Sequence, residues 1–210
     1  MGEPERRRRR SAEEVRSLLL LAAARAFVDR GYAQTSTREI AGDAGVSQPL
    51  LFRHFGGKAG LFTQTVVAGF AAACAEFAER WWAPIGRDEP RARAFLRDLF
   101  DVLAENREAV VAMVGVYAYE ADSQELSRGV VDVFAALLGV VRDVLLCDTE
   151  GTFLEGVDDV DTPAVVLAAL LGCAVFDDWL FDAQLHRPEN AVVIEELSTI
   201  VLHGFTHRQG

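Results

Sequence analysis

The stretch that decides the fold runs from Ser36 to Phe55 and reads STREIAGDAGVSQPLLFRHF. Ser36 and Glu39 have the spacing of a capping box, in which each side chain bonds the backbone amide of the other residue at the start of a helix. This predicts a short helix that closes at Gly45. Glycine suits the turn that follows, because it adopts the left-handed conformation without strain.

A second short helix is predicted from Gln48 to Phe55. Ser47 is expected to cap it, and Pro49 is acceptable in its first turn. Two short helices joined by a tight turn are typical of a helix-turn-helix, whose second helix enters the major groove of DNA. Apolar residues occupy the positions that such a motif must bury, namely Ile40, Ala41, Ala44, Val46, Leu51 and Phe55.

Helical spacing of apolar residues continues on both sides of this motif. A first helix is predicted from Ala12 to Arg30, started by a capping box of Ser11 and Glu14 and stopped by Gly31. Strand patterns are nearly absent, so the predicted fold class is all-α with about nine helices. The remaining helices are expected at 58–82, 90–105, 107–120, 124–146, 162–185 and 190–207.

Charge is distributed unevenly along the chain. The 21 basic and 32 acidic residues give a net charge of −11, yet residues 1–60 hold eleven positive and seven negative charges, leaving −15 for the remainder. A basic end on an acidic body is expected when only one end meets nucleic acid. We therefore predict a basic disordered arm (1–11), a helix-turn-helix DNA-binding domain (12–57) and a helical ligand-binding and dimerisation domain (58–210).

Cysteine usage and hydropathy bear on the cellular compartment. Cys74, Cys147 and Cys173 are odd in number and stand in apolar helical surroundings, which favours buried, reduced thiols in an intracellular protein. No run of about 18 apolar residues is free of charge, and no apolar segment follows the N-terminal arginines. We expect a cytoplasmic protein.

The motif and its flanks are similar to one family in particular. The segments AAARAF (22–27), GY (31–32), STREIA (36–41), AGVS (44–47), LFRHF (51–55) and KAGL (58–61) resemble the tetracycline-repressor (TetR) family of regulators. The strong resemblance extends from Val15 to Val66; downstream it is only architectural. It implies a three-helix DNA-binding domain joined through a fourth helix to a helical domain for ligand binding and dimerisation.

Four residues are candidates for reading DNA bases. Gln48 and Pro49 match the base-contacting positions of the family; glutamine can pair with an adenine edge, and the proline ring can pack on a thymine methyl. Arg38 and Arg53 could reach guanine or phosphate. Leu50 stands where a small or polar residue is commoner in the family, which puts a further polar contact in doubt.

Other residues are candidates for gripping phosphates. His54 and Lys58 match phosphate-contacting positions, and backbone amides at the helix starts, at Thr37 and Lys58, add to them. The family usually has tyrosine at the position of Phe52, whose ring lacks the hydroxyl that typically meets a phosphate. The run Arg6 to Arg10 either reaches the minor groove or phosphates, or is a solvated tail.

The resemblance implies that the second domain senses a small hydrophobic effector. Aromatic residues after the fourth helix could line its pocket, although aromatics at helical spacing are more often plain core. The candidate ligand-binding residues are Met113, Tyr117, Phe134, Phe176, Asp178 and Trp179.

The last two predicted helices have broad apolar faces that include Val165, Val166, Leu170, Val193 and Ile200. Either these faces are covered within one chain, or they form a four-helix interface in a homodimer, which two-fold DNA recognition favours. Ligand binding would move the fourth helix. The two recognition helices would then no longer match the half-sites of a palindromic operator, about one helical turn (~34 Å) or a multiple apart. Repression relieved by ligand is the expected sense.

Rival interpretations remain. Aspartate clusters at 158–161 and 177–182 resemble those that hold magnesium and diphosphate in helical prenyl-transfer enzymes, but the cluster at 177–182 lacks a partner basic cluster and the one at 158–161 falls in a predicted loop. His203 and His207 have the spacing of a helical metal pair, without a further ligand at a matching offset. We expect no enzyme, no cofactor and no metal. A DNA-binding regulator controlled by a protein partner, without a small-molecule ligand, is the main alternative.

Overall fold

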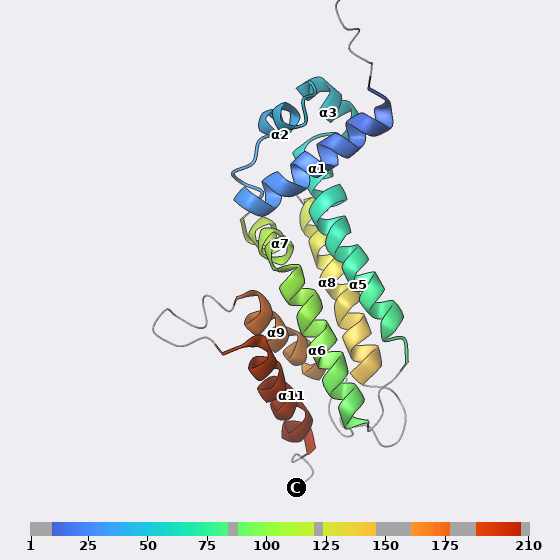
Figure 1. The fold of residues 1–210 in the computed structure, drawn as a ribbon, viewed down its shortest axis with the longest axis vertical. Helices are drawn as coiled ribbons and strands as arrows, with labels where there is room; N and C mark the ends of the chain where they lie inside the picture. The colour runs from blue at the N-terminus through green and yellow to red at the C-terminus, as the bar shows by residue number, and fades with distance from the viewer. Residues whose placement is uncertain (1–9, 84–87, 120–123, 146–160, 177–187, 207–210) are drawn as a thin grey trace, which may run out of the picture.

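The computed structural model describes residues 10–83, 88–119, 124–145, 161–176 and 188–206. Within these ranges the chain forms helices and no strands, which confirms the all-α prediction. Figure 1 shows a small head stacked on a longer helical body. The head contains α1 (Ala12–Arg30), α2 (Thr37–Asp43) and α3 (Gln48–Phe55). The body contains α6 (Glu89–Glu105), α7 (Arg107–Tyr119), α8 (Gln124–Leu145), α9 (Asp161–Val175) and α11 (Asn190–Thr206).

The head is built from the local signals in the sequence. The Ser11 hydroxyl accepts a hydrogen bond from the Glu14 amide at 3.0 Å, and the Glu14 carboxylate accepts one from the Ser11 amide at 2.7 Å. Ser36 and Glu39 repeat this capping box at α2. Gly45 has a φ of +62°, the left-handed value that the turn between α2 and α3 requires.

The start of α3 differs from the prediction in one respect. Ser47 is the N-cap residue, but its side chain makes no capping hydrogen bond. Its backbone carbonyl instead accepts hydrogen bonds from the amides of Leu50 at 3.0 Å and Leu51 at 3.3 Å. Pro49, which has no amide hydrogen to satisfy, occupies the first turn as predicted.

The loop between α1 and α2 is closed by a buried threonine. Thr35 is 2% exposed, and its hydroxyl lies 3.0 Å from the Ala26 carbonyl and 2.8 Å from the Gly31 carbonyl. The hydroxyl can donate to either carbonyl, so its buried oxygen is satisfied by the end of α1. This contact fixes where the chain leaves α1 and therefore where α2 begins.

One continuous helix of 23 residues, Lys58–Arg80, joins the head to the body. It comprises α4 (Lys58–Phe62), the π-helical turn η1 (Thr63–Val67) and α5 (Ala68–Arg80). At the π turn the Thr65 hydroxyl donates to the Leu61 carbonyl at 2.7 Å, which compensates for the disturbed helical hydrogen bonding there. Length and composition alone would let this helix cross a membrane, but its large apolar residues, including Phe62, Phe70 and Phe77, are buried in the protein core.

The head and the body share one hydrophobic core. Phe27 of α1 contacts Phe62 of α4 edge-to-face, with ring centroids 5.2 Å apart, and Tyr32 packs against both rings. The π turn also packs against α1, α7 and α8. The domain boundary predicted between residues 57 and 58 thus falls where the head and the connecting helix pack against each other. The division into domains stays a prediction.

In the body, α6 runs along its length and packs against α5, α9 and α11. Arg93 of α6 reaches α11, where its guanidinium lies 2.8 Å from the Glu195 carboxylate, and it also pairs with Glu89 at 2.9 Å. The part of α9 predicted beyond residue 176 lies outside the described residues. Elsewhere the predicted helix ranges are matched closely.

Candidate nucleic-acid interface

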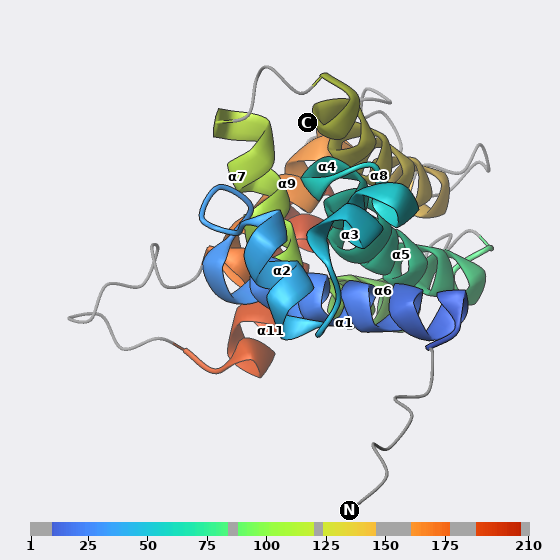
Figure 2. The same ribbon diagram turned by 90° about the horizontal axis from the view of Figure 1, so that it is seen from above.

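The outer end of the head is formed by α2 and α3, as the view from above shows (Figure 2). Leu51 and Phe55 of α3 are buried against the head, with exposures of 0% and 6%. Burial of these two residues on one side leaves Arg53 exposed and Gln48 half-buried. The helix therefore offers a polar edge beginning at its N-terminal turn, which is the geometry of a recognition helix.

The starts of α2 and α3 lie side by side. The Gln48 side-chain amide donates to the Thr37 hydroxyl at 2.9 Å, so two predicted DNA-contacting residues are brought together. Arg38 and Pro49, which follow them in the two helices, are exposed. Two hydrogen bonds from Ser36 to the Glu39 carboxylate lower the pKa of Glu39, the one from the Ser36 hydroxyl at 2.9 Å being the larger cause and the one from the Ser36 amide at 3.1 Å the second.

Two side chains that are predicted to contact phosphates, those of Lys58 and His54, are restricted by their surroundings in the head. The Lys58 ammonium lies 4.1 Å from the centroid of the Tyr32 ring and 3.4 Å from the Ala33 carbonyl, to which it donates. His54 is half-buried, and its Nε2 is buried with no hydrogen-bond partner among the described residues. A phosphate contact by His54 would therefore have to use Nδ1. Phe52 is 48% exposed and presents an apolar ring to solvent.

Arg10 is a residue whose position the sequence did not reveal. Its guanidinium donates to the Gly45 carbonyl at 2.9 Å and to the Ala44 carbonyl at 3.3 Å, at the end of α2. A cation here also complements the negative end of the helix dipole. The only signal in the sequence was that the arginine run ends directly before the cap of α1; Arg6 to Arg9 lie outside the described residues.

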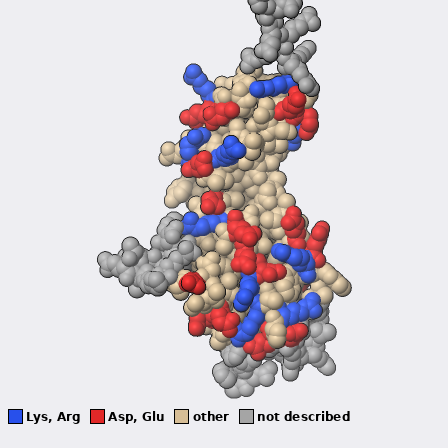
Figure 3. All heavy atoms as spheres, in the orientation of Figure 1, with Lys and Arg blue, Asp and Glu red and all other residues tan. Residues whose placement is uncertain are grey.

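Charge on the visible face does not divide simply between head and body. Figure 3 shows both signs of charge on each part. Residues 10–60 carry seven basic and five acidic side chains, so much of the positive excess predicted for the N-terminal sixty residues comes from Arg6 to Arg9. The described head is thus only mildly basic, and any DNA contact depends on the placement of individual side chains.

The predicted ligand-binding residues separate into three groups. Tyr117 and Phe134 come together on an apolar groove of about 400 Å³ between α7, α8 and α9, lined also by Val114, Val131, Leu138 and Leu167. Met113 is 0% exposed and does not line the groove, since it faces the core; Phe176 does not line it either. Asp178 and Trp179 lie outside the described residues.

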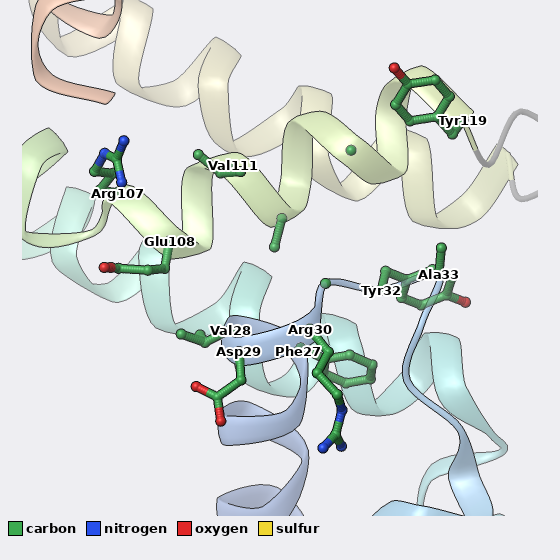
Figure 4. A pocket seen from close by; sticks show the side chains of 13 residues that line it. Phe27, Val28, Asp29, Arg30, Tyr32, Ala33, Arg107, Glu108, Val111 and Tyr119 are labelled. Atoms are coloured by element: carbon green, nitrogen blue, oxygen red, sulfur yellow. The ribbon is translucent and has the colours of Figure 1, made fainter. Parts of the chain in front are cut away.

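A second hollow lies where the head meets the body. It measures about 480 Å³ and is lined by the last turn of α1, the loop after it, and α7 (Figure 4). Small residues line much of it, including Gly31, Ala33, Ala112 and Gly115. Figure 4 shows the side chains of Asp29 and Arg30 pointing away from α7, while Arg107 and Glu108 of α7 also line this space.

The residues on which rival interpretations depend are largely outside the described ranges. The aspartates at 158–160 and 177–182 and His207 are among them, and so are the side chains of Asp161 and His203. Among the described residues, no group of three histidines, cysteines or acidic residues is placed to hold a metal ion.

Two short helices with an exposed polar start, set on a packed third helix, define a helix-turn-helix DNA-binding domain. Residues 19–65 match the family model described as bacterial regulatory proteins, tetR family. The resemblance predicted from the sequence is therefore confirmed.

Known proteins agree with this assignment. The HTH-type transcriptional activator FasR of Mycolicibacterium smegmatis is 50% identical over 50 residues, which cover 24% of this chain and 23% of FasR. The chain thus spans about a quarter of the length of this curated relative.

Solved structures share this fold over most of the chain. A bacterial regulatory protein in the tetR family from Rhodococcus RHA1 covers 90% of this chain and 95% of its own at a TM-score of 0.69 and 15% identity. The transcriptional regulator FadR from Bacillus subtilis, in complex with stearoyl-CoA, covers 91% and 98% at a TM-score of 0.58 and 17% identity.

Proposed function

We propose that this chain is a ligand-responsive transcriptional regulator that binds a palindromic operator as a homodimer. The observation that carries the proposal is the exposed start of α3, where Gln48 meets Thr37 of α2 at 2.9 Å on the outermost end of the head. A glutamine at the start of a recognition helix has the donor and acceptor needed to read an adenine edge. The proposed site of action is the cytoplasm, where DNA is accessible.

The DNA-contacting set that we propose is Gln48 and Pro49 for bases, with Arg38 and Arg53 reaching base or phosphate. Lys58, His54 and the start of α2 at Thr37 would grip phosphates. The Lys58 ammonium is held over the Tyr32 ring, beside the head. Less side-chain conformational entropy is therefore lost when Lys58 contacts a phosphate.

The groove between α7, α8 and α9 supports an effector that is hydrophobic. Its lining is almost entirely aliphatic and aromatic, with Tyr117 at its rim, 61% exposed, as a polar-tipped residue. FadR from Bacillus subtilis, which has a similar fold, is in complex with stearoyl-CoA, and this supports long-chain acyl compounds as the first candidates. The alternative, a regulator controlled by a protein partner, predicts that such compounds leave DNA binding unchanged.

The dimer interface that we propose lies on α9 and α11. Val165, Val192 and Ile200 are 63%, 50% and 65% exposed, so two helices that pack against each other both present large apolar side chains to solvent. Val166, Leu170 and Val193, which were predicted for the same interface, are instead buried within the chain. The self-complementary face would therefore be narrower than the sequence suggested.

The switch that we propose runs through the connecting helix. The groove is walled by α7 and α8, and both of these helices pack against η1, which in turn packs against α1. An effector that favours a different spacing of α7 and α8 would therefore shift the head, and with it the separation of the two recognition helices. Release of the operator by ligand is the sense that we propose.

Selection of bound DNA from a random pool, followed by a salt titration, tests the proposal. A palindromic consensus is expected, and Gln48→Ala should relax it at one base position. Lys58→Ala should weaken all sequences similarly and reduce the salt slope by about 1. Arg97→Ala, an exposed arginine on α6 of the body, is the matched control and should leave the slope unchanged. Binding without sequence preference, or none, would refute the DNA-reading role.

A further titration separates the two forms of control. Stearoyl-CoA and free fatty acids are added to the complex with the selected operator, with coenzyme A as the control that lacks the acyl chain. Release by the acyl compounds alone supports a hydrophobic effector. Val131→Arg, which places a charge on the groove wall, should abolish the release without affecting operator binding. Release by coenzyme A itself would refute recognition through the groove.

A further inference from the structure

The hydrogen bond between Gln48 and Thr37 joins two residues eleven positions apart. The Gln48 Nε2 donates to the Thr37 Oγ1 at 2.9 Å, and both side chains are half-buried. Each residue is the first of its helix, and these two helices form the outer end of the head. The contact is formed without DNA and therefore sets the orientation of the glutamine before any base arrives.

The backbone on both sides of this contact is fixed. The capping box of Ser36 and Glu39 holds the first turn of α2, to which Thr37 belongs. Pro49, with its φ locked by the ring, follows Gln48 in the first turn of α3. Ile40 and Leu51, both 0% exposed, hold the two helices in the core of the head. The side-chain hydrogen bond thus connects two rigid supports.

Resting on the proposed DNA-reading function, we infer that Thr37 is a positioning residue that makes α3 select adenine over guanine. It does so by occupying one of the two N–H groups of the Gln48 amide. The second N–H and the carbonyl oxygen are then the groups left to meet a base.

The donor and acceptor pattern of purines explains the selection. In the major groove adenine presents an acceptor at N7 and a donor at N6, which match one N–H and one carbonyl oxygen. Guanine presents acceptors at both N7 and O6, so a two-point contact with it needs two N–H donors from the amide. With one N–H bound to Thr37, the amide carbonyl of Gln48 would face O6 of guanine, and two acceptors would repel each other. A glutamine without the Thr37 contact could turn and offer both N–H groups.

The test compares Thr37→Val, which keeps the shape but removes the hydroxyl, with Thr37→Ser, which keeps the hydroxyl. Binding is measured to the selected operator and to versions in which the adenine of the Gln48 contact is replaced by guanine. For Thr37→Val we expect the preference for adenine to fall about fivefold or more. Affinity for the best sequence should fall about two- to tenfold, since the glutamine must then be ordered on binding. Thr37→Ser should restore both.

Two results would overturn the inference. One is a Thr37→Val protein that loses affinity for adenine and guanine operators equally, which would mean that Thr37 contributes only phosphate contact or stability. The other is unchanged side-chain amide resonances of Gln48 in the NMR spectrum of free Thr37→Val, which would mean that the hydrogen bond does not hold the amide. Failure of the proposed function is distinguishable, because the wild-type protein would then select no consensus at all.

Discussion

Replacing Gly60 by alanine, which adds one methyl group, should destabilise the packing between the head and the connecting helix. It lies in α4, at the start of the connecting helix. A Cβ placed there would lie much closer than 3.0 Å to the carbonyl oxygen of Phe55, and real Cβ contacts essentially never occur below that distance. It would also lie 3.1 Å from the Phe55 carbonyl carbon. The obstacle is backbone at the end of α3, so no side-chain rotation can relieve it.

The magnitude follows from two opposed effects. Replacing a helical glycine by alanine stabilises a helix by about 0.5–1 kcal/mol through the lower entropy of the unfolded chain. Overpacking against a rigid neighbour costs about 1–3 kcal/mol. Gly69, further along the same helix, is exposed and has open space around its Cβ position, so Gly69→Ala is a matched control that retains only the favourable effect. The difference in unfolding free energy between the two variants therefore reports the clash.

Urea unfolding followed by circular dichroism, at one protein concentration for all variants, measures this difference. Gly60→Ala should be less stable than Gly69→Ala by about 1–3 kcal/mol. It should also bind the operator more weakly, because relieving the clash moves α3 away from the connecting helix. Equal stability of the two variants would refute the reasoning, since it would show that the end of α3 yields at no cost.

Three further predictions concern the head and the body. Thr35→Val should lower the unfolding free energy by about 1–3 kcal/mol in calorimetry, because the buried contacts with two carbonyls are lost. The control Thr63→Val, on the exposed side of η1, should leave the unfolding free energy unchanged. Arg10→Gln should weaken operator binding in a fluorescence titration while Arg97→Gln leaves it unchanged, since the Arg10 side chain contacts the end of α2 and Arg97 lies on α6; equal effects would argue against this role. Burial raises the pKa of the Cys74 thiol to about 11 from 9.0, so its contribution to stability is present below pH 9 and is lost as the pH rises towards 11. In urea unfolding across this range, wild type should lose more stability than Cys74→Ala, and parallel curves would contradict the prediction.

Local chemistry explains why the helix-turn-helix could be predicted so closely. A capping box needs only residues three apart, and a left-handed turn needs only a glycine, so Ser36, Glu39 and Gly45 could be assigned from the sequence. Ser47 shows the limit of this reasoning. Serine is a good N-cap residue, yet the side chain makes no cap here, because the choice between capping and other orientations depends on surroundings that the sequence does not display.

The ligand candidates show a second limit. Apolar periodicity marks which face of a helix is buried, but not which helix covers it. Met113 and Tyr117 are four residues apart on α7, which puts them on adjacent turns, yet Met113 is 0% and Tyr117 61% exposed. The buried face of α7 carries Val110, Met113 and Val116, whereas Val114 and Tyr117 lie on the adjacent face and line the groove whose other walls α8 and α9 supply.

The sequence by itself determined where the helices of the head begin and end, that the chain is all-helical, and that residues 36–55 form a helix-turn-helix, because each of these properties depends on neighbours within a few positions. Tertiary structure alone decided the contacts between distant residues. It brought Gln48 to Thr37, Arg10 to the end of α2, Lys58 over Tyr32, and the Gly60 backbone against Phe55. These contacts depend on how the helices pack in three dimensions, and they orient the side chains that we propose to meet DNA.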